Sequence, residues 1–532
     1  MKKYLFLAIA IFLFINNVSA QFRMSEGANK VASVMTIVEG MYVDKIDDNQ
    51  FSEDAIKAII EKLDPHSSYI SAAEAREMNE PLEGNFDGIG ISFQIKSDTL
   101  YVIETIVGGP SEKIGLRPGD KIIYVNDTLI AGVKKTNKDI MSRLRGKKGT
   151  TVDIKVLRRG VPQLIDFRIT RDKIPIYSLD AAYMVDNNIG YIRLSRFGAT
   201  TTQEFRDACK RLKNEGMKNL ILDLEGNGGG YMSAAIDIVN DFLPKNRLIV
   251  YTEGANQPKQ EFNSSGKGLF EEGKLVVLID EYSASASEIV SGAVQDWDRA
   301  VIVGRRSFGK GLVQRQIPFR DESMLRLTVA RYYTPTGRSI QRPYTNGDNE
   351  TYNMDVVARY NRGEMMHADS IHFPDSLAYK TLVNERTVYG GGGIMPDYYV
   401  PVDTTANSTY IRKVYFAMIP NKIALDEVDK YRKDLLAKYP TAADFREKFI
   451  VDNELLDKVI AAATEAKIEF NEDEFIRSKP ILERNLKVAI GRDLYDTEAS
   501  VKIMNDYSQI FQKGMEIIKD NKLYNDLLIR KR

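Results

Sequence analysis

The most constraining feature of the sequence is a pair of short apolar runs, 274–280 and 300–304, joined by a stretch with helical spacing, 281–296. Short apolar runs bounded by charged residues predict buried strands, and a helix between two of them is typical of α/β folds. Three serines lie where the first strand passes into the helix: Ser283, Ser285 and Ser287. The unpaired N–H groups and positive dipole end of a helix stabilise an oxyanion, so the geometry favours acyl transfer.

A purely structural interpretation also fits this junction. Ser285 and Glu288 form an S-x-x-E pattern. This pattern predicts a capping box, in which the serine and the glutamate satisfy backbone N–H groups at the helix start. A capping box explains a serine here without any chemistry, and both interpretations stay open at this point.

Lys310 provides a base for a serine nucleophile. The chain has three histidines, and all are distant from this stretch in sequence: His66, His367 and His372. A lysine can replace a histidine only if its pKa, ordinarily about 10.4, falls by a few units through burial or nearby positive charge. Gly309 and Gly311 allow tight backbone bends around Lys310. Gln314 lies four residues further on and could hydrogen-bond the amine to fix its direction.

Several segments together resemble the carboxy-terminal processing (tail-specific) proteases: SASASE, the 25-residue step from Ser285 to Lys310, FGKGLVQ and the upstream glycine run at 228–230. Those proteins are serine proteases with a Ser-Lys dyad on a crotonase-like fold that carries an inserted PDZ domain. The resemblance implies that Ser285 is the nucleophile, Lys310 the general base and Gln314 the residue that orients the lysine. Such an enzyme needs no metal or cofactor.

The resemblance also implies an oxyanion hole made by Gly229 or Gly230 together with the N–H of Ala286. The chain departs from the family pattern just before these glycines, because Glu225-Gly-Asn-Gly stands where Arg-Asn-Asn-Pro is common. The identity of the donor therefore stays open. Asp296 matches a position that matters in some family members, but a helix-end or salt-bridge role explains it equally well.

Three other motifs overlap these residues, and each fails. Gly304 to Lys310 matches the first seven positions of a phosphate-binding P-loop, but Gly311 replaces the magnesium-binding Ser or Thr and a strand follows instead of a helix. Ser307 to Lys310 fits S-x-x-K, which needs a helical turn where this chain has Phe-Gly. Tyr231 replaces the last glycine of a dinucleotide-binding fingerprint. The sequence thus predicts no cofactor site.

The composition of the chain limits its number of domains, its binding partners and its cysteine chemistry. The chain has 532 residues, 43% of them hydrophobic, which is enough for three or four domains with a sizeable core. Lys plus Arg and Asp plus Glu are both 74, which argues against nucleic acid as the main partner. Cys209 is the single cysteine, so an internal disulfide and a thiolate metal cluster are excluded, and we expect it in the core.

Residues 1–20 resemble a secretory signal peptide. Two lysines precede an apolar stretch at 4–15, and Asn-Asn-Val-Ser-Ala follows before Gln21. The apolar stretch is short for a membrane span, and no cysteine follows Ala20 to receive a lipid. We therefore expect export to the periplasm, with secretion as the alternative, and no stable membrane span after signal removal; an uncleaved anchor is the competing interpretation.

The remaining chain predicts an α+β multidomain protein. Helical spacing indicates an N-terminal helical domain at 21–82, where DPHSSYIS at 64–71 resembles a stretch common in the same family. His66 in that stretch suggests a loop histidine that holds a helix end rather than a catalytic group. Short alternating strands at 83–173 resemble a PDZ domain with Ile89, Gly90 and Ile91 as its carboxylate-binding loop. The apolar loop predicts ligands with apolar C-termini, whereas a small β-barrel without a ligand is the alternative.

The predicted protease core, a crotonase-like α/β domain, spans 174–404. Within it, 342–388 is rich in polar residues and is interpreted as a surface insertion without an assigned role. Amphipathic spacing at 405–532 predicts a C-terminal helical domain. That domain could support homo-oligomer assembly or substrate gating, and helices simply packed on the core are the alternative.

The sequence is compatible with two alternative functions, one enzymatic and one non-catalytic. The first is an exported serine endopeptidase that recognises C-terminal tails of protein substrates through its PDZ domain. The second is a non-catalytic PDZ scaffold or chaperone that binds chain ends without cutting. The complete set of Ser285, Lys310 and Gln314 favours the first, because a protein without catalytic activity would be free to lose at least one of them.

Overall fold

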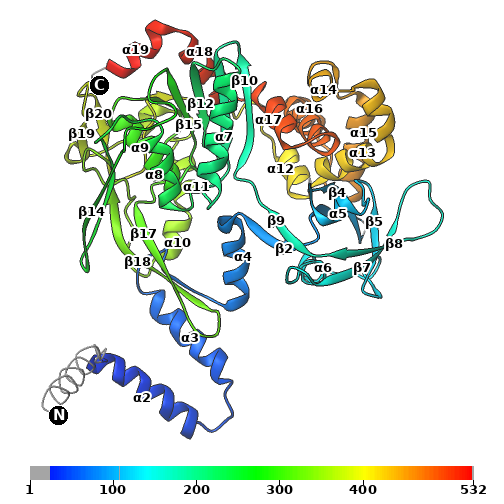
Figure 1. Ribbon diagram of the computed structural model, residues 1–532, viewed down its shortest axis with the longest axis horizontal. Coiled ribbons are helices and arrows are strands. Elements are labelled where there is room, and N and C mark those ends of the chain that lie inside the picture. The colour runs from blue at the N-terminus through cyan, green and yellow to red at the C-terminus, as the bar shows by residue number, and fades with distance from the viewer. Residues whose placement is uncertain (1–23, 97, 107, 530–532) are drawn as a thin grey trace, which may run out of the picture.

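The computed structural model describes residues 24–96, 98–106 and 108–529, so the predicted signal peptide lies outside the described residues. Figure 1 shows a central α/β body, a projecting N-terminal helical arm, a small β-rich domain beside the body and a bundle of helices above that domain. The predicted α+β multidomain class is confirmed. Within the described part of the chain, no helix combines the length and the apolarity needed to cross a bilayer.

The central body is built on a six-stranded sheet with the order β10-β11-β12-β15-β16-β21. The first pair is antiparallel and all later pairs are parallel. The strands are β10 (Leu179–Asp186), β11 (Ile189–Leu194), β12 (Asn219–Asp223), β15 (Leu275–Ile279), β16 (Val301–Gly304) and β21 (Tyr398–Tyr399). The two predicted strands around the serines are therefore β15 and β16, which are adjacent and parallel.

Both faces of this sheet are covered, which explains why its strands are apolar throughout. Successive side chains of a strand point to opposite faces. In β12, Leu220 and Leu222 pack into the core cluster on one face, whereas Ile221 packs into the cluster on the other. The first face is covered by α7 (Thr201–Asn214), α8 (Met232–Asn240) and α9 (Ala286–Asp296). Cys209 on α7 is fully buried in this cluster, as expected for a core cysteine.

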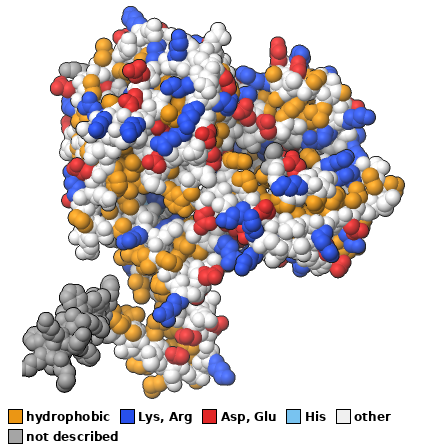
Figure 2. Space-filling view, viewed as in Figure 1, with side chains coloured by type: hydrophobic (Ala, Val, Ile, Leu, Met, Phe, Trp, Pro, Cys, Tyr) orange, Lys and Arg blue, Asp and Glu red, His pale blue; other side chains and the backbone are white. Residues whose placement is uncertain are grey.

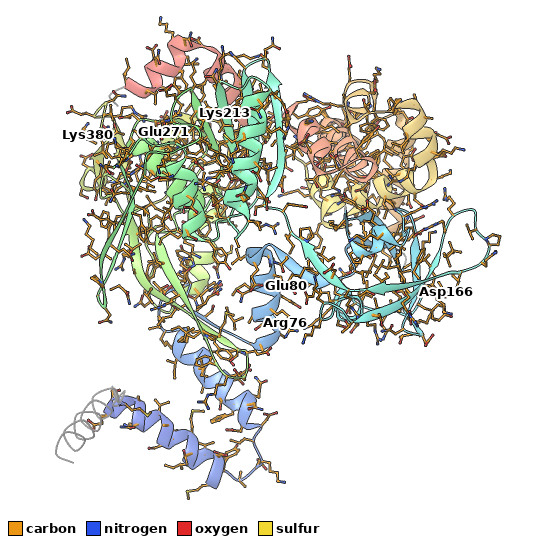
Figure 3. All side chains as sticks on the ribbon, viewed as in Figure 1. Arg76, Glu80, Asp166, Lys213, Glu271 and Lys380 are labelled. Atoms are coloured by element: carbon orange, nitrogen blue, oxygen red, sulfur yellow. The ribbon has the colours of Figure 1, made fainter. Side chains whose placement is uncertain are left out.

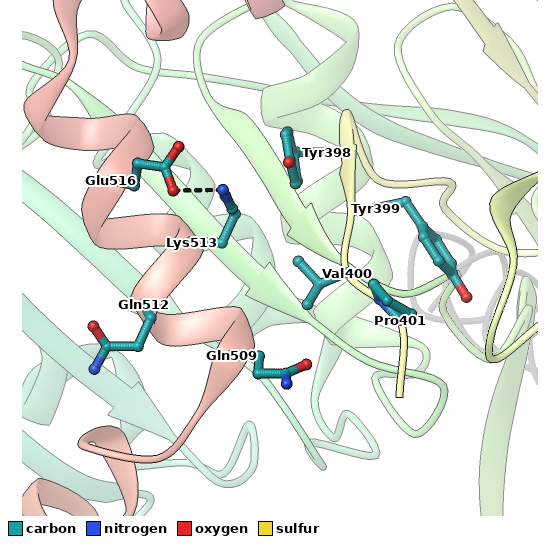
Figure 4. A pocket seen from close by; sticks show the side chains of 8 residues that line it. All are labelled: Tyr398, Tyr399, Val400, Pro401, Gln509, Gln512, Lys513 and Glu516. Atoms are coloured by element: carbon teal, nitrogen blue, oxygen red, sulfur yellow. Dashed lines mark hydrogen bonds and ion pairs between the residues drawn. The ribbon is translucent and has the colours of Figure 1, made fainter. Parts of the chain in front are cut away.

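The second face is covered by the last two helices of the chain, α18 (Gln509–Lys519) and α19 (Asn521–Ile529). The sequence placed these helices in one C-terminal helical domain. Amphipathic spacing shows that a helix has an apolar face, but it does not identify the surface against which that face packs. A pocket of about 510 Å³ lies between α18 and β21, and Figure 4 shows its lining side chains, including the ion pair of Lys513 with Glu516.

The other C-terminal helices form a bundle with a hydrophobic cluster of its own. They are α12 (Thr409–Phe416), α13 (Ile419–Lys438), α14 (Ala442–Lys448), α15 (Asn453–Glu465), α16 (Glu472–Leu494) and α17 (Thr497–Asn505). This bundle contacts the small β-rich domain through α13. Arg159 of that domain pairs with Asp429 and donates to the carbonyl of Lys430. The bundle therefore helps to fix the position of the β-rich domain.

The β-rich domain has the sheet order β3-β4-β5-β7-β8, with β6 beside β5. Its strands are β3 (Ile91–Lys96), β4 (Thr99–Thr105), β5 (Lys121–Val125), β6 (Thr128–Leu129), β7 (Thr151–Leu157) and β8 (Ile165–Thr170), and its helices are α5 (Pro110–Lys113) and α6 (Asn137–Leu144). A separate ladder of β2 (Asn85–Gly88) with β9 (Asp172–Pro175) joins it to the body. Because β3 is an edge strand of the sheet, it can accept a further strand.

The N-terminal segment contributes α2 (Glu26–Met41), α3 (Asp48–Ile60), β1 (Ser68–Ile70) and α4 (Ala72–Glu83). The helix α2 buries none of its residues and projects from the body with α3. Figure 2 shows apolar side chains on this arm, and Val34, Ile37 and Met41 on α2 are all exposed. In contrast, α4 lies between the body and the β-rich domain (Figure 1). Its Glu80, labelled in Figure 3, forms an ion pair with Arg145.

A second sheet of the body carries the segment after the predicted catalytic lysine. Its order is β1-β18-β13-β14, and β17 also pairs with β18. These strands are β13 (Leu248–Gly254), β14 (Gln257–Asn263), β17 (Leu312–Pro318) and β18 (Met324–Tyr333). The short N-terminal strand β1 is an edge strand here, paired antiparallel with β18. The N-terminal segment is thus integrated into the sheet that holds Gln314.

The predicted surface insertion at 342–388 folds into short elements. They are α10 (Asn349–Asn353), α11 (Asp355–Asn361), two 3-10 turns at Ala368–Ser370 and Asp375–Leu377, and the hairpin strands β19 (Ala378–Lys380) and β20 (Thr387–Tyr389). Arg359 of this segment is almost fully buried, with 1% of its surface exposed. The surface interpretation was therefore wrong for part of the segment, and the next section gives the physical reason.

Candidate active site

Ser285 lies at the N-cap of α9, directly after the turn that follows β15. Its backbone has φ 55° and ψ −110°, a conformation that residues with a side chain rarely adopt. Such strained backbone is concentrated at functional sites because the surrounding structure must hold it in place. The side chain is half-buried rather than enclosed. The sequence predicted the position of this serine at the junction but not its strained backbone.

Glu288 holds the two halves of the predicted dyad together. One oxygen of its fully buried carboxylate accepts from the backbone N–H groups of Ser285 at 2.8 Å and Lys310 at 2.9 Å. The other oxygen accepts from Ser307 Oγ at 2.5 Å and from the N–H of Gly309 at 2.7 Å. The predicted capping box is therefore present, and the same glutamate also anchors the lysine loop. Burial raises the pKa of Glu288 to about 7, although these hydrogen bonds oppose the rise.

Tyr332 supplies a second bridge between the same two residues. Its hydroxyl is 2.7 Å from the carbonyl oxygen of Lys310 and 3.2 Å from that of Ser285. The ring is buried, with 1% of its surface exposed. Neither Tyr332 nor the loop-anchoring role of Glu288 was found from the sequence, because both depend on contacts between distant segments. The only sequence feature that pointed to Glu288 was its place as the glutamate of the S-x-x-E pattern.

We expect Glu288→Ala to lower the free energy of unfolding of the body by about 3 to 5 kcal/mol, because it leaves a cavity and four buried donors without an acceptor. The single tryptophan of the chain, Trp297, directly follows α9, so its fluorescence during urea unfolding reports on this region. The matched control is Glu74→Ala, which removes the glutamate of the exposed capping box on α4 and should cost about 0.5 kcal/mol. Equal losses in the two variants would contradict the anchoring role.

Lys310 lies in the loop between β16 and β17, and its environment has the predicted effect. Burial lowers the pKa of its amine to about 8, and the positive charge of Arg326 adds to the shift. Glu288 and Asp64 act in the opposite direction. A lysine with this pKa is neutral in a useful fraction of molecules near neutral pH, as a general base must be.

The side chains of Ser285 and Lys310 are not hydrogen-bonded to one another within the described residues. Catalytic hydrogen bonds are often longer in ligand-free enzymes and tighten when substrate binds. The backbone anchors at Glu288 and Tyr332 place the two residues side by side. The Ser285 to Lys310 contact itself stays a prediction.

Gln314 has a partner that the sequence did not identify, and its contact with Lys310 stays a prediction. Its side-chain nitrogen Nε2 donates to Thr328 Oγ1 at 3.3 Å. The two residues are direct cross-strand partners in the β17–β18 ladder, where a bulge follows Val313. Bulges change the direction of side chains, so the face that Gln314 occupies could not be read from its spacing to Lys310.

The glycine turn before α8 lies directly against Ser285. Gly229 has φ 97°, and a Cβ added there would lie 2.8 Å from the Cβ of Ser285 and 3.0 Å from the backbone nitrogen of Ala286. Only glycine fits this close approach. The N–H of Gly229 donates to Asn227 Oδ1 at 2.9 Å, so it is not available for an oxyanion. The N–H groups of Gly230 and Ala286 have no acceptor within the described residues, which favours Gly230 over Gly229 as the glycine donor.

Asn227 is a further residue that the sequence did not identify. Its side chain fixes the N–H of Gly229 and donates to the carbonyl of Leu194 at 2.8 Å. Its own carbonyl accepts from the N–H of Ala284 at 3.0 Å and from Ser287 Oγ at 2.8 Å. Asn227 therefore ties the glycine turn to both sides of Ser285, and Ser287 has a structural role.

The segment 342–388 also supports the lysine loop. The guanidinium of Arg359 donates to the carbonyl oxygens of Ser307 at 3.0 Å and Arg306 at 2.7 Å. The guanidinium of Arg342 lies between two rings, 3.9 Å from the ring centre of Phe308 and 3.8 Å from that of Tyr352. The polar composition of this segment thus reflects buried arginines that satisfy loop carbonyls, which a sequence cannot distinguish from exposed arginines.

Two other residues singled out from the sequence have structural roles here. Asp296 is fully buried in a salt bridge with Arg338 at 2.7 Å, which supports the salt-bridge interpretation. His66 Nε2 lies 2.9 Å from the hydroxyl of Tyr352, so the histidine contacts the 342–388 segment. Burial, followed by the charge of Lys310, lowers the pKa of His66 to about 3. No group of three or more His, Cys, Asp or Glu side chains in the described ranges is arranged to hold a metal.

The β-rich domain has a small pocket of about 80 Å³ between β3 and α6. All three residues of the predicted carboxylate-binding loop line it, among Phe86, Ile89, Gly90, Ile91, Phe93, Met141, Leu144 and Arg145. Gly90 has φ 75°, which suits a loop whose N–H groups turn toward a ligand. The pocket is mostly apolar, and Arg145 at its edge is paired with Glu80 of α4.

Comparisons with known proteins match the parts of the chain that carry this site and the pocket of the β-rich domain. A sequence model of peptidase family S41 matches residues 188–351, and a PDZ domain model matches residues 88–169, which confirms the predicted PDZ domain. Residues 410–496, in the C-terminal bundle, match a family of unknown function (DUF8443).

Two curated relatives and one solved structure are similar to the chain. The carboxy-terminal-processing protease of Bartonella bacilliformis is 38% identical over 309 residues, which are 57% of this chain and 70% of the relative. The carboxy-terminal processing protease CtpA of Bacillus subtilis is 36% identical over 306 residues, 57% of this chain and 65% of the relative. A solved photosystem II D1 C-terminal processing protease is 26% identical with a TM-score of 0.34, covering 60% of this chain and 90% of that one.

Proposed function

Because the chain belongs to the carboxy-terminal processing proteases, which are serine-type peptidases, we propose that it is an exported endopeptidase with a Ser-Lys mechanism. The observation that carries this proposal is the Glu288 carboxylate, which binds the backbone of Ser285 and the backbone of Lys310 with one oxygen. A non-catalytic protein would need no such link between a strained serine and a buried lysine.

In the proposed mechanism, the neutral amine of Lys310 takes the proton from Ser285 Oγ as that oxygen attacks the carbonyl carbon of the peptide. The N–H groups of Gly230 and Ala286 hold the resulting oxyanion at the N-terminus of α9. The lysine then gives its proton to the leaving amine, and the peptide C–N bond breaks. Water hydrolyses the acyl-enzyme, with Lys310 again accepting a proton.

Substrates are recognised in this proposal by their C-terminal tails. The tail would add as a strand beside the edge strand β3 and place its last side chain in the pocket between β3 and α6. Ile89, Gly90 and Ile91 would bind the terminal carboxylate through their backbone. The apolar lining of the pocket supports a preference for tails that end in an apolar residue.

Export and assembly complete the proposal. The charged start and apolar stretch of residues 1–20 support export, with the periplasm as the destination. Homo-oligomer formation through the C-terminal helices is proposed because the bundle leaves Phe416 and Ile450 94% and 81% exposed.

The experiment that tests this function uses one unfolded protein substrate with two tails, ending in Leu-Ala-Ala or in Asp-Asp-Asp. We expect the apolar tail to be cleaved with a kcat/KM roughly 10- to 30-fold higher, because a charged side chain in the apolar pocket loses its hydration without gaining a partner. New fragments measured by mass spectrometry indicate a peptidase. Binding of the apolar tail without any fragment would instead favour the scaffold alternative.

A pair of variants tests whether the pocket between β3 and α6 causes the preference for an apolar tail. Met141→Asp puts a charge into the pocket and is expected to remove the advantage of the apolar tail. Ser142→Asp adds the same charge to the neighbouring, exposed position on α6 and should leave the advantage unchanged. If both variants keep the preference, the tail is recognised elsewhere.

A further inference from the structure

A chain of hydrogen bonds leads from Gln314 to the N-terminal segment. Gln314 Nε2 donates to Thr328 Oγ1 at 3.3 Å, and Thr328 Oγ1 donates to Asp64 Oδ1 at 2.8 Å. Asp64 lies before β1 and is buried, with 8% of its surface exposed. The DPHS stretch, far away in sequence, is therefore linked through Thr328 to Gln314, the candidate that orients the lysine.

The polarity of this chain is fixed at Asp64. An ionised carboxylate can only accept hydrogen bonds. Burial alone would raise the pKa of Asp64, but hydrogen bonds led by those of Ser67 and Thr328 make the net shift downward, so the group is ionised at neutral pH. Thr328 must then use its single hydroxyl proton toward Asp64. Its oxygen is left only as an acceptor for the next donor.

This polarity determines which end of the Gln314 amide faces which neighbour. Thr328 can accept only from the amide nitrogen, so Nε2 is turned toward Thr328. The amide oxygen Oε1 accepts no hydrogen bond within the described residues. The lone pair of a neutral lysine amine must accept the serine proton, so the amine has only its N–H groups for other neighbours, and these need an acceptor such as Oε1.

We propose that Asp64 is a positioning residue that acts through Thr328 to fix the Gln314 amide, so that its oxygen and not its nitrogen is offered to Lys310. This inference rests on the proposed function, because it assigns Lys310 and Gln314 their roles in the Ser-Lys mechanism. A reversed amide would place N–H donors against the N–H groups of the lysine and would misalign the base. Asp64, Thr328, Gln314 and Lys310 thus form one directed relay behind Ser285.

The position of Asp64 does not depend on Thr328 alone. Ser67 donates to Asp64 Oδ2 through its hydroxyl at 2.6 Å and accepts from the N–H of Thr328 at 3.0 Å. The pairing of β1 with β18 adds a further anchor for the segment. Ser67→Ala therefore weakens the anchoring of the loop while leaving the relay intact, and it serves as the matched control.

The test compares Thr328→Val, Thr328→Ser, Asp64→Asn and Ser67→Ala with the wild type on an unfolded substrate. We expect Thr328→Val and Asp64→Asn to lower kcat roughly 10- to 100-fold with KM changed less than about twofold, because the base is misaligned rather than the substrate released. Thr328→Ser restores the hydroxyl and should recover kcat to within about threefold of wild type. Ser67→Ala should also stay within about threefold.

A second readout measures Lys310 directly and does not depend on turnover. Lysines labelled with ¹³C at Cε are titrated by NMR, and the Lys310 signal is assigned from its absence in Lys310→Arg. The charged groups around this amine are Arg326, Glu288 and Asp64, and the neutral His66 lies nearby. Asp64→Asn removes a negative charge and Thr328→Val removes the alignment of the Gln314 oxygen, so both should lower the pKa of Lys310, whereas Ser67→Ala should not.

The outcomes separate the relay from the proposed function. If the wild type does not cleave, or if Ser285→Ala cleaves equally well, the proposed function fails, and the NMR titration still decides whether the relay reaches Lys310. If the wild type cleaves but Thr328→Val keeps its kcat and its Lys310 pKa, the relay is wrong. An equal loss in Ser67→Ala and Thr328→Val would also overturn it, since loop anchoring alone would then explain both.

Discussion

Ser285→Ala is expected to lower kcat for peptide-bond cleavage by roughly four to six orders of magnitude, the loss seen when a nucleophile is removed from an acyl-transfer site. The hydroxyl is the only group lost. The backbone N–H of residue 285 still donates to Glu288, and alanine carries the same Cβ at the same φ of 55°, so the strain at this position does not change. Loss of the Ser285 side-chain cap on α9 should cost only about 1 kcal/mol, so the variant should still fold and bind substrate tails.

Fragment formation from an unfolded substrate, followed by mass spectrometry, measures this loss, and Trp297 fluorescence in urea confirms the fold. The control is Ser291→Ala, which removes a buried hydroxyl from the same helix, where it only donates to the carbonyl of Ser287 at 2.8 Å. That variant should cleave within about threefold of wild type. Cleavage by purified Ser285→Ala at more than a hundredth of the wild-type rate would show that another nucleophile does the work.

Local signals in the sequence located the strand–helix junction that carries Ser285. The junction of β15 and α9 follows from an apolar run that meets helical spacing, and it locates Ser285. The glycine run at 228–230 permits a close backbone approach, and the structure shows that Gly229 makes this approach to Ser285. Lys310 was found by exclusion, because no histidine lies near the serine in sequence. Only the position of Ser285 follows from neighbouring residues alone, whereas the roles of Lys310 and of the glycine run rest also on the family resemblance.

The parts that were missed all depend on which distant segments meet. Glu288 could be recognised as a cap, but its contacts with the lysine loop require β16 to lie beside β15. The partner of Gln314 depends on a bulge and on the register of β17 against β18. Arg359 looked like a surface residue because charge in a sequence carries no information about burial.

The same limit applies to the two terminal helices. Apolar residues such as Phe511 and Ile518 predicted amphipathic helices but not the sheet face that they cover. If the other helices of the body cover only one face of the central sheet, the second apolar face needs further helices to cover it. The continuous apolar run in β12 indicated that helices must cover both faces of the sheet, since the side chains on both faces of the strand are apolar.

Replacement of Lys310 is the second change with a very large expected effect. Lys310→Arg keeps the positive charge, but a guanidinium stays protonated at any working pH and cannot act as a base. Lys310→Met keeps most of the volume and removes both the charge and the base. Both variants should lose roughly three to four orders of magnitude in kcat, and the agreement between them would show that proton transfer rather than charge is required.

Unfolding cannot explain the loss in Lys310→Met. Burial lowers the pKa of Lys310 from its usual 10.5 in the unfolded chain to about 8 in the folded protein, so the unfolded chain binds more protons between these values. The protonated amine therefore opposes folding below about pH 8, and this cost disappears as the pH rises toward 10.5. At pH 7 the Met variant should be as stable as wild type or more stable, as measured by urea unfolding.

The pH dependence of the wild type gives an independent check on the same base. Only the neutral amine accepts a proton, so kcat/KM should rise about tenfold per pH unit below pH 8 and level off above it, because the pKa of Lys310 is about 8. His66, with a pKa of about 3, stays neutral across this range and adds no further titration step to the pH profile of kcat/KM. Glu288, with a pKa of about 7, shares the site, but its carboxylate is needed to hold the Lys310 loop, so its protonation steepens the fall below pH 7. A profile that is flat from pH 6 to pH 9, together with activity in Lys310→Arg, would mean that the buried amine is not the base.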